Sequence, residues 1–420
     1  LLEQKSRQIS LHADSLCTLC SREHSAGLLL DFGQEMHGGL EFSVQSVSGA
    51  KHVQLRIRFG ESAAEAMSEL GGQTHATNDH AMRDYVMYLP WYGVSETGNS
   101  GFRFVRIDLL EDDVVVPVQE IRAKFTYRDI PYLGSFRSSD PRLDSIWMTG
   151  AYTVHLNMQD YLWDGIKRDR LVWMGDAHPE LCTMLAVFGD NEVMKKTLDQ
   201  ARDQTPLPGW MNGICAYSLW WALIHHDYYM YTGDLDYLRE QQSYMNALFD
   251  MAAGMVDGQG HEHMTGAGRF LDWPTSRDRK AVDAGLHALL LMTFDAGIRM
   301  AGALGDTALA AKCSSAAERM RKVTPDYATT KQSAALAGLV PARQVNEEVL
   351  KKGGVEGFST FYGYYMLQAK AKAGDYAGAI DNIDTYWGAM LDLGATTFWE
   401  DFDIKWLDNA ARIDELVPEG

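Results

Sequence analysis

The pattern of apolar and polar positions divides the chain into two parts. Between about residues 26 and 130, short runs such as 40–44 and 53–59 mostly alternate apolar with polar residues, which is typical of half-buried β-strands. Similar runs follow at 85–88, 102–107 and 121–125, separated by Gly and Ser. The pattern predicts an antiparallel β-sandwich domain over residues 26–130. We assign no domain to residues 1–25, which form an N-terminal segment.

Helical periodicity replaces this pattern over residues 139–420. Asp140 is a favourable N-cap, and Pro141 suits the first position of a helix. A Gly-Asp pair recurs along this part, at 189–190, 233–234, 305–306 and 374–375. Each Gly is expected to end one helix and each Asp to cap the next.

The helices before these pairs are apolar on almost every side, whereas those after them carry one apolar stripe. The first kind is expected to be buried and the second to face solvent. This alternation predicts inner and outer helices paired in a six-hairpin (α/α)6 toroid with a pocket at its axis. We count about eleven helices where twelve are needed, so we expect a toroid that lacks its closing segment at the C-terminus.

Composition narrows the classes of function. Acidic residues outnumber basic ones 57 to 38, for a formal net charge of -19, which argues against nucleic acid and anionic membrane surfaces as partners. No run approaches the roughly 18 apolar residues of a membrane span, so we expect no membrane partner. Nucleotide-binding glycine loops are absent from the sequence, and we expect no cofactor.

Cysteine and histidine spacing gives no complete metal site. Cys17 and Cys20 have C-x-x-C spacing, but no second pair or nearby histidine pair completes a zinc set. Packing, or a local disulfide in an exported protein, is the expected role. His261 and His263 flank Glu262 without a third ligand, so we expect no metal there either.

The stretch 163–176 is chemically the most unusual part of the chain. It combines three carboxylates, three cations and two tryptophans without a helical apolar period. An exposed indole forgoes a large burial gain, and a core helix does not hold six charges. The stretch is therefore interpreted as a pocket lining around Asp164, Asp169 and Asp176, with a structural ion-pair network as the alternative.

Two other loops carry similar combinations. Glu400 lies just beyond a helix that Gly394 is expected to end, among the aromatic residues of 398–406; a solvated turn is the alternative. Asp272 and Trp273 occupy a loop between helices, where they suit a hydroxyl ligand and a stacking ring; ordinary turn chemistry is the alternative. Glycoside hydrolysis requires two carboxyl groups facing each other across a sugar, and these loops supply candidates.

In combination, these motifs resemble those of the α-L-rhamnosidases of glycoside hydrolase family 78. The family motif Asp-x-x-x-Arg-Glu-Arg-Leu-Gly-Trp-x-Gly-Asp is similar to residues 164–176, with Asp169 in place of Glu and Val172 in place of Gly. The motif Gly-Ala-Thr-Thr-x-Trp-Glu matches residues 394–400. The pair 272–273 resembles the family's Gly-Asp-Trp loop, and 101–104 its Gly-Phe-Arg-Tyr strand.

The resemblance implies an inverting exo-acting hydrolase that removes terminal α-L-rhamnose from plant-type glycans or glycosides. It implies that Asp169 is the general acid and Glu400 the base. The substrate-binding residues that we predict are Asp164, Arg168, Trp173, Asp176, Asp272, Trp273 and Trp399. We also expect Trp163 to share one cavity with Trp173, Trp273 and Trp399.

The expected partner is a carbohydrate, and the expected location is exported, periplasmic or extracellular. Another (α/α)6-barrel glycosidase and a catalytically lapsed sugar-binding relative remain the alternatives.

Overall fold

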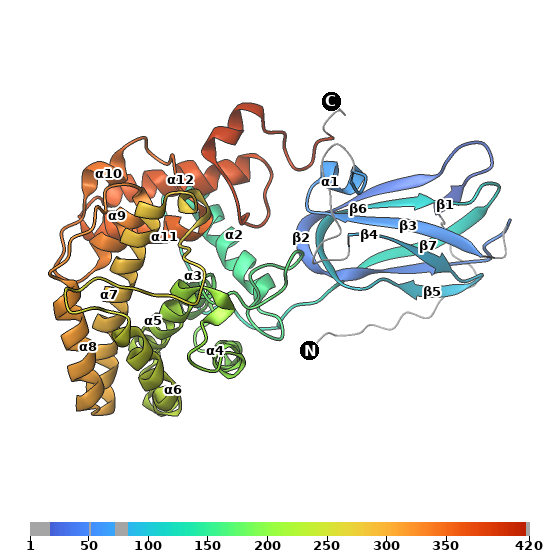
Figure 1. Ribbon diagram of the computed structural model, residues 1–420. Coiled ribbons are helices and arrows are strands. Elements are labelled where there is room, and N and C mark those ends of the chain that lie inside the picture. Colours follow the sequence, from blue (N-terminus) through green and yellow to red (C-terminus); the bar gives the residue numbers. More distant parts are fainter. Residues whose placement is uncertain (1–16, 50–51, 72–82, 417–420) are drawn as a thin grey trace.

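The chain folds into an antiparallel β part followed by a large helical part (Figure 1). The computed structural model describes residues 17–49, 52–71 and 83–416. Among these described residues the β part has seven strands: β1 (Cys17–Cys20), β2 (Gly27–Val44), β3 (Val53–Gly60), β4 (Asp84–Leu89), β5 (Gly93–Glu96), β6 (Ser100–Leu109) and β7 (Val115–Phe125). The short helix α1 (Ala63–Met67) lies after β3.

The strands form one continuous sheet in the order β1-β7-β2-β6-β3-β4, with β5 paired to β2. All pairings among the described strands are antiparallel, as predicted. The predicted sandwich differs from this arrangement in having two separate sheets. Here the described strands stay in one sheet, because the long strand β2 pairs with β6 over its first part and with β7 and β5 over its second. Leu40, Phe42, Ile57 and Phe59 are among the fully buried residues of the core.

Strand β1 corrects the expected start of the β domain at residue 26. Cys17–Cys20 pairs with Val115–Val118 of β7, so the sheet already includes this segment. Both cysteines are exposed free thiols, and the local disulfide considered from their spacing is not formed.

Eleven α-helices follow in the described residues after 140: α2 (Pro141–Asn157), α3 (Ala177–Val187), α4 (Glu192–Gln204), α5 (Cys215–Thr232), α6 (Leu235–Gly254), α7 (Arg279–Leu304), α8 (Thr307–Met320), α9 (Lys331–Leu339), α10 (Glu347–Lys351), α11 (Thr360–Lys372) and α12 (Tyr376–Asp392). Short 3-10 turns occur at Met211–Gly213, Trp273–Thr275 and Ile404–Asn409. Helices α3, α5, α7, α9 and α11 contact one another in that order, and their side chains form most of the large helical core.

The Gly-Asp junctions behave as predicted at three of four positions. All four glycines have a positive φ, between 70° and 85°, a conformation that glycine adopts without a Cβ penalty. Asp234, Asp306 and Asp375 accept hydrogen bonds from backbone N–H groups of the helices that they precede. At the fourth junction Asn191, not Asp190, caps α4, because the Asp190 carboxylate accepts a hydrogen bond from Tyr228 instead.

Helix α7 corrects the statement that no segment approaches a membrane span. It is 26 residues long with a mean hydropathy of 1.3 over its most apolar window, which meets the length and composition of a span. However, 78% of that window is buried inside the protein, where α7 packs against α5, α8 and α9. Burial of this extent is typical of a helix in the core of a folded domain.

The β part and the helical part are joined by hydrogen bonds to α2 and to the loop after α12. The backbone N–H of Glu35 donates to Thr396 Oγ1 at 2.9 Å, and the Glu35 carbonyl accepts from the Tyr152 hydroxyl at 2.5 Å. Arg103 donates to the carbonyl of Gly394 at 3.2 Å. Strands β2 and β6 therefore lie directly against α2 and the loop that carries Glu400.

Candidate active site

The loop between α2 and α3 carries the charged and aromatic stretch in a tightly constrained backbone. Asp164 and Leu171 are joined twice, by the Asp164 N–H to the Leu171 carbonyl and by the Leu171 N–H to Asp164 Oδ1, both at 3.0 Å. Within the loop that these two hydrogen bonds close, Asp169 and Arg170 have φ values of 50° and 53°. Such conformations cost non-glycine residues about 1–3 kcal/mol and cluster at functional sites.

One pocket of about 200 Å³ gathers eight of the nine predicted site residues. They are Asp164, Arg168, Asp169, Trp173, Asp176, Asp272, Trp273 and Glu400. We call this the sugar pocket. The ninth, Trp399, lines an adjoining pocket of about 320 Å³. Residues from three loops far apart in the sequence thus meet at the N-terminal ends of the buried helices.

Asp169 and Glu400, the predicted acid and base, both contact the guanidinium of Arg168. Arg168 Nε lies 3.7 Å from Asp169 Oδ1, and its Nη2 lies 3.8 Å from Glu400 Oε2. Asp169 Oδ2 also accepts a hydrogen bond from Trp173 Nε1 at 3.2 Å. The Asp169 side chain is 15% exposed, whereas those of Glu400 and Arg168 are each 62% exposed. The pocket therefore holds one sheltered and one open carboxylate around a shared cation.

Asp164 and Asp176 form a half-buried acidic lining with raised pKa values. Burial raises the pKa of Asp164 to about 7, with further contributions from the charges of Asp169 and Glu400. Burial likewise raises the pKa of Asp176 to about 7, and the charge of Asp164 adds to it. Near neutral pH these groups are partly protonated, so they can both donate to and accept from sugar hydroxyls.

Asp272 is fixed by protein groups on three sides. Its Oδ2 accepts from the Ser359 hydroxyl at 2.6 Å and from Gln332 Nε2 at 3.0 Å, and its Oδ1 accepts from the Trp273 N–H at 3.0 Å. Burial raises its pKa to about 6. These contacts help to set the position of the exposed Trp273 ring. That ring packs edge-on against the Phe270 ring, with the ring centroids 5.1 Å apart.

Sequence reasoning missed three polar residues of this site. Tyr217 donates to Asp176 at 3.4 Å from within the apolar helix α5, whereas Gln332 and Ser359 hold Asp272. A serine just before the helical segment 360–372 is an N-cap signal, and Ser359 does cap α11. No comparable signal marks Tyr217 or Gln332, which lie within helices and belong to no motif.

The expectation that four tryptophans share one cavity is wrong for Trp163 and for Trp399. The Trp163 ring packs edge-on against His37 of β2, with ring centroids 5.4 Å apart. It therefore contributes to the contact between the two parts of the chain. Trp173 and Trp273 line the sugar pocket, and Trp399 faces the adjoining one.

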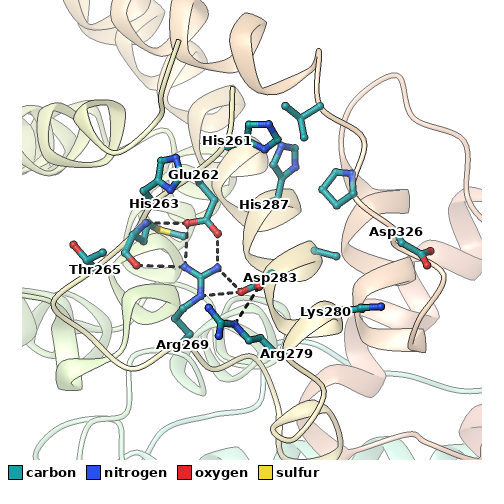
Figure 2. Close-up of a pocket in the computed structure, with 14 residues that line it drawn as sticks. His261, Glu262, His263, Thr265, Arg269, Arg279, Lys280, Asp283, His287 and Asp326 are labelled. Carbon is teal, nitrogen blue, oxygen red and sulfur yellow. Dashed lines mark hydrogen bonds and ion pairs between the residues drawn. The ribbon is translucent and has the colours of Figure 1, made fainter. Parts of the chain in front are cut away.

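A larger cleft, of about 710 Å³, lies between the α6–α7 loop and the first turns of α7 (Figure 2). At its centre Arg269 pairs with Glu262 and, at 2.7 Å, with Asp283. His261 and His263 line it, and His263 Nε2 contacts Asp257 at 3.0 Å. The cleft holds neither Asp169 nor Glu400, and its central charges are neutralised in pairs.

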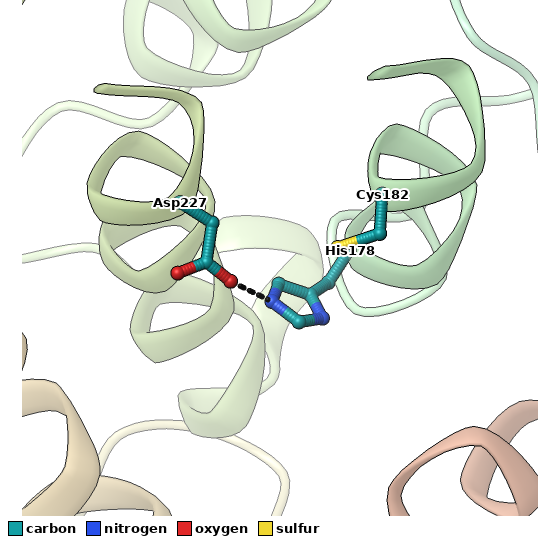
Figure 3. Close-up of side chains that lie close together, drawn as sticks. All are labelled: His178, Cys182 and Asp227. Carbon is teal, nitrogen blue, oxygen red and sulfur yellow. Dashed lines mark hydrogen bonds and ion pairs between the residues drawn. The ribbon is translucent and has the colours of Figure 1, made fainter. Parts of the chain in front are cut away.

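The cluster of His178, Cys182 and Asp227 has the side-chain types of a metal site (Figure 3). Their ligand atoms lie within 4.8 Å of one another. His178 is already engaged, through Nδ1 with the Tyr365 hydroxyl at 2.9 Å and through Nε2 with Asp227 at 3.1 Å. Burial raises the pKa of the Cys182 thiol to about 12, which disfavours the thiolate that a metal requires. The contacts describe a hydrogen-bonded core cluster.

The carboxylate pocket at the N-terminal ends of the buried helices has the two carboxyl groups that glycoside hydrolysis requires, and the family comparison places the chain in that class. Residues 131–349 match the family described as the bacterial alpha-L-rhamnosidase 6 hairpin glycosidase domain. This match covers just over half of the 420 residues, and the chain belongs to this family. The resemblance noted from the sequence motifs is thereby confirmed.

A curated relative is the alpha-L-rhamnosidase of Alteromonas sp. (strain LOR), 26% identical over 297 residues, or 65% of this chain. The chain spans only 30% of the length of that relative. The family 78 rhamnosidase structure of Bacillus sp. GL1 is similar at a TM-score of 0.78 and 21% identity, over 96% of this chain and 46% of that one.

A rhamnosidase structure from Klebsiella oxytoca with rhamnose bound matches at a TM-score of 0.77 and 19% identity. It covers 96% of this chain and 85% of that one. At these sequence identities, both comparisons show that the fold is shared.

Proposed function

We propose that the chain catalyses hydrolysis of terminal α-L-rhamnosides with inversion, on a six-hairpin toroid. The observation that carries the proposal is the arrangement of Asp169 and Glu400 around Arg168, in a pocket that Asp164 and Asp176 also line. Membership of the rhamnosidase family and the name of the Alteromonas relative support rhamnose as the sugar. The Klebsiella rhamnosidase, which has rhamnose bound, agrees with this choice.

In the proposed reaction Asp169 gives its proton to the glycosidic oxygen as the bond to the sugar breaks. Glu400 takes a proton from a water molecule, whose oxygen forms the new bond at the opposite face of the sugar. Inversion needs about 6.5–9.5 Å between the two carboxyl groups to admit this water. The hydrogen bond from Trp173 Nε1 fixes the orientation of the Asp169 carboxyl, and the left-handed backbone at 169–170 aims it into the pocket.

The reaction predicts different effects for the two carboxylates. Asp169→Asn should lower kcat by about 10²–10⁴-fold on rhamnosides with poor leaving groups, which need protonation, and less on an activated aryl rhamnoside. Glu400→Gln should lower kcat on both, because water attack is required whatever group leaves. Initial rates on the two substrate types measure this, and proton NMR of the released sugar should show the β-anomer first.

Asp408→Asn, in the exposed 3-10 turn after Glu400, is the control and should keep the wild-type rate. Release of the α-anomer first contradicts inversion. Wild-type turnover by Asp169→Asn on the poor substrate removes Asp169 from the role of acid.

A further inference from the structure

The 3-10 turn Met211–Gly213, between α4 and α5, contacts the loop that carries Asp169. Its central residue, Asn212, has a φ of 52° and a ψ of 16°, a left-handed conformation that Gly, Asn and Asp adopt more readily than other residues. Asn212 is exposed and does not line the sugar pocket. Any effect that it has on a sugar held there must therefore pass through other residues.

The carboxamide of Asn212 makes two hydrogen bonds to that loop. Its Nδ2 donates to the carbonyl oxygen of Val172 at 2.9 Å, and its Oδ1 accepts from the backbone N–H of Met174 at 3.1 Å. The carbonyl belongs to the peptide unit before Trp173, and the N–H belongs to the peptide unit after it. Because each peptide unit is planar, one side chain holds both planes that flank Trp173. It thereby sets the direction of the Trp173 side chain.

The Trp173 indole reaches from this backbone to the predicted acid. Its Nε1 donates to Asp169 Oδ2 at 3.2 Å. Its ring packs edge-on against Tyr217 of α5, with the ring centroids 6.1 Å apart and an angle of 86° between the planes. Asp169 has a left-handed backbone, which persists in non-glycine residues only where surrounding contacts hold it. The Trp173 indole supplies one such contact.

The turn that carries Asn212 is itself anchored on two sides. The Met211 N–H donates to the buried hydroxyl of Ser218 in α5 at 3.0 Å. The Gly268 N–H donates to the Gly213 carbonyl at 2.8 Å, which joins the turn to the loop that leads to Asp272. Asn212 therefore ties Trp173 to the core of the helical part, and not to another mobile side chain.

We propose that Asn212 is a positioning residue for the general acid: its carboxamide fixes the backbone of Trp173, and the Trp173 indole in turn holds the Asp169 carboxyl toward the glycosidic oxygen. This rests on the proposed function, in which Asp169 is the acid, and adds to it a residue outside the sugar pocket. Because Asn212 acts through Asp169, its loss weakens protonation of the leaving group. Activation of water by Glu400 is unaffected.

The test measures how strongly turnover depends on the leaving group. Asn212→Gly removes the carboxamide and keeps a residue that readily adopts a positive φ. The ratio of kcat on an alkyl rhamnoside, which has a poor leaving group, to kcat on an activated aryl rhamnoside should fall at least about fivefold, well inside the about 100-fold cost of misplacing a reacting group by about 1 Å. KM for both substrates should stay within about twofold of wild type, since no contact to the sugar is removed.

A second variant tests the donating half of the Asn212 contacts. In Asn212→Asp the side chain tolerates the left-handed backbone and can accept from the Met174 N–H, but a carboxylate cannot donate to the Val172 carbonyl. The ratio should fall in this variant too, and Asn212→Asp decides the question if Asn212→Gly does not fold. Thermal unfolding of each variant checks its folding.

A double variant tests whether Asn212 acts through Asp169. In Asp169→Asn the acid is already lost, so the addition of Asn212→Gly should leave the ratio within about twofold of that of Asp169→Asn alone. Losses that multiply in the double variant overturn this route.

Asn346→Gly is the matched control, since Asn346 is also exposed and its side chain also accepts from a backbone N–H, that of Val349 in α10. Glycine replaces asparagine at a helix start at little cost, and the ratio should stay near the wild-type value. A folded Asn212 variant with the wild-type ratio, or with equal losses on both substrates, overturns the positioning role. A wild-type protein that hydrolyses neither rhamnoside overturns the proposed function itself.

Discussion

The acidic residues of the sugar pocket have different surroundings. Asp164 and Asp176, each with a pKa raised to about 7, are each partly protonated near neutral pH. Asp272 accepts hydrogen bonds from Ser359, Gln332 and the Trp273 backbone, and these contacts hold the turn at Trp273 in place. The two sequence motifs contain these aspartates, Asp164 and Asp176 in the stretch 163–176 and Asp272 in the pair 272–273, but do not distinguish their environments.

Stability should depend on the charge of Asp176 in a definite direction. Its pKa rises from 3.8 to about 7 on folding, so the folded state binds more protons than the unfolded state between these values. The free energy of unfolding contributed by Asp176 therefore falls as pH rises through this window. Asp176→Asn removes the buried charge, and it should raise Tm relative to wild type by more at pH 8 than at pH 5.

The expected gain at pH 8 is on the order of 2–4 kcal/mol, since one pKa unit corresponds to about 1.4 kcal/mol. Thermal unfolding of both proteins at the two pH values measures it. Glu318→Gln, at an exposed position of α8, is the control and has no burial penalty to lose. A Tm difference that shrinks as pH rises contradicts the assigned sign.

At the scale of secondary-structure elements, the helix boundaries that depend on neighbouring residues could be predicted from the sequence. Glycine at a positive φ followed by aspartate ends one helix and begins the next, and three of the four pairs do so. The exception at Asp190 arises from Tyr228, which lies 38 positions away. A local sequence pattern does not reveal a competing hydrogen-bond partner that lies far away along the chain.

Helix α9 shows the other limit of such patterns. Its Lys331, Gln332 and Ser333 are buried, although polar residues normally mark a solvent-facing surface. Lys331 donates to the carbonyl of Glu356 at 2.7 Å, and Gln332 to Asp272 at 3.0 Å. The burial is satisfied by tertiary hydrogen bonds, which the sequence does not specify.

Asp306 links two elements and offers a test of the junctions. Its Oδ1 caps α8 through the Leu309 N–H at 2.9 Å, and its Oδ2 accepts from Gln242 and Asn246 of α6 at 3.0 and 2.9 Å. Asp306→Ala should lower the free energy of unfolding by about 2–3 kcal/mol, combining a lost cap with two lost hydrogen bonds. Chemical denaturation measures the change.

Asp306→Asn is the matched control, because asparagine caps helices about as well as aspartate but its NH2 group cannot accept the two hydrogen bonds that Oδ2 accepts. It should retain the share of stability that the cap contributes, about 1 kcal/mol. Equal losses in the two variants would assign the effect to the Oδ2 contacts with α6 and not to the cap.

At the scale of the whole molecule, the motifs identified the loops that line the sugar pocket but not the surface that supports them. The hydrogen bond between Glu35 and Thr396 joins residues 361 positions apart, and neither local sequence indicates it. Lys167, within the stretch 163–176, pairs with Glu65 of α1. The β domain therefore supports the two loops that carry the predicted acid and base.

Strand β6 provides the most direct test of this dependence, because Gly101 lies against the catalytic loop. A Cβ added there would lie 2.8 Å from Ile166 Cγ1 and 3.0 Å from the Ile166 backbone carbon, and Ile166 is itself buried. The loop from 164 to 170 must shift to admit a methyl group. Gly101→Ala should thus lower kcat/KM for an aryl rhamnoside about tenfold or more, since displacements of about 1 Å at an active site cost up to about 100-fold. Gly254→Ala, where nothing lies within 4 Å, should keep wild-type kcat/KM, and a wild-type value for Gly101→Ala would show that the loop holds its geometry without the β domain.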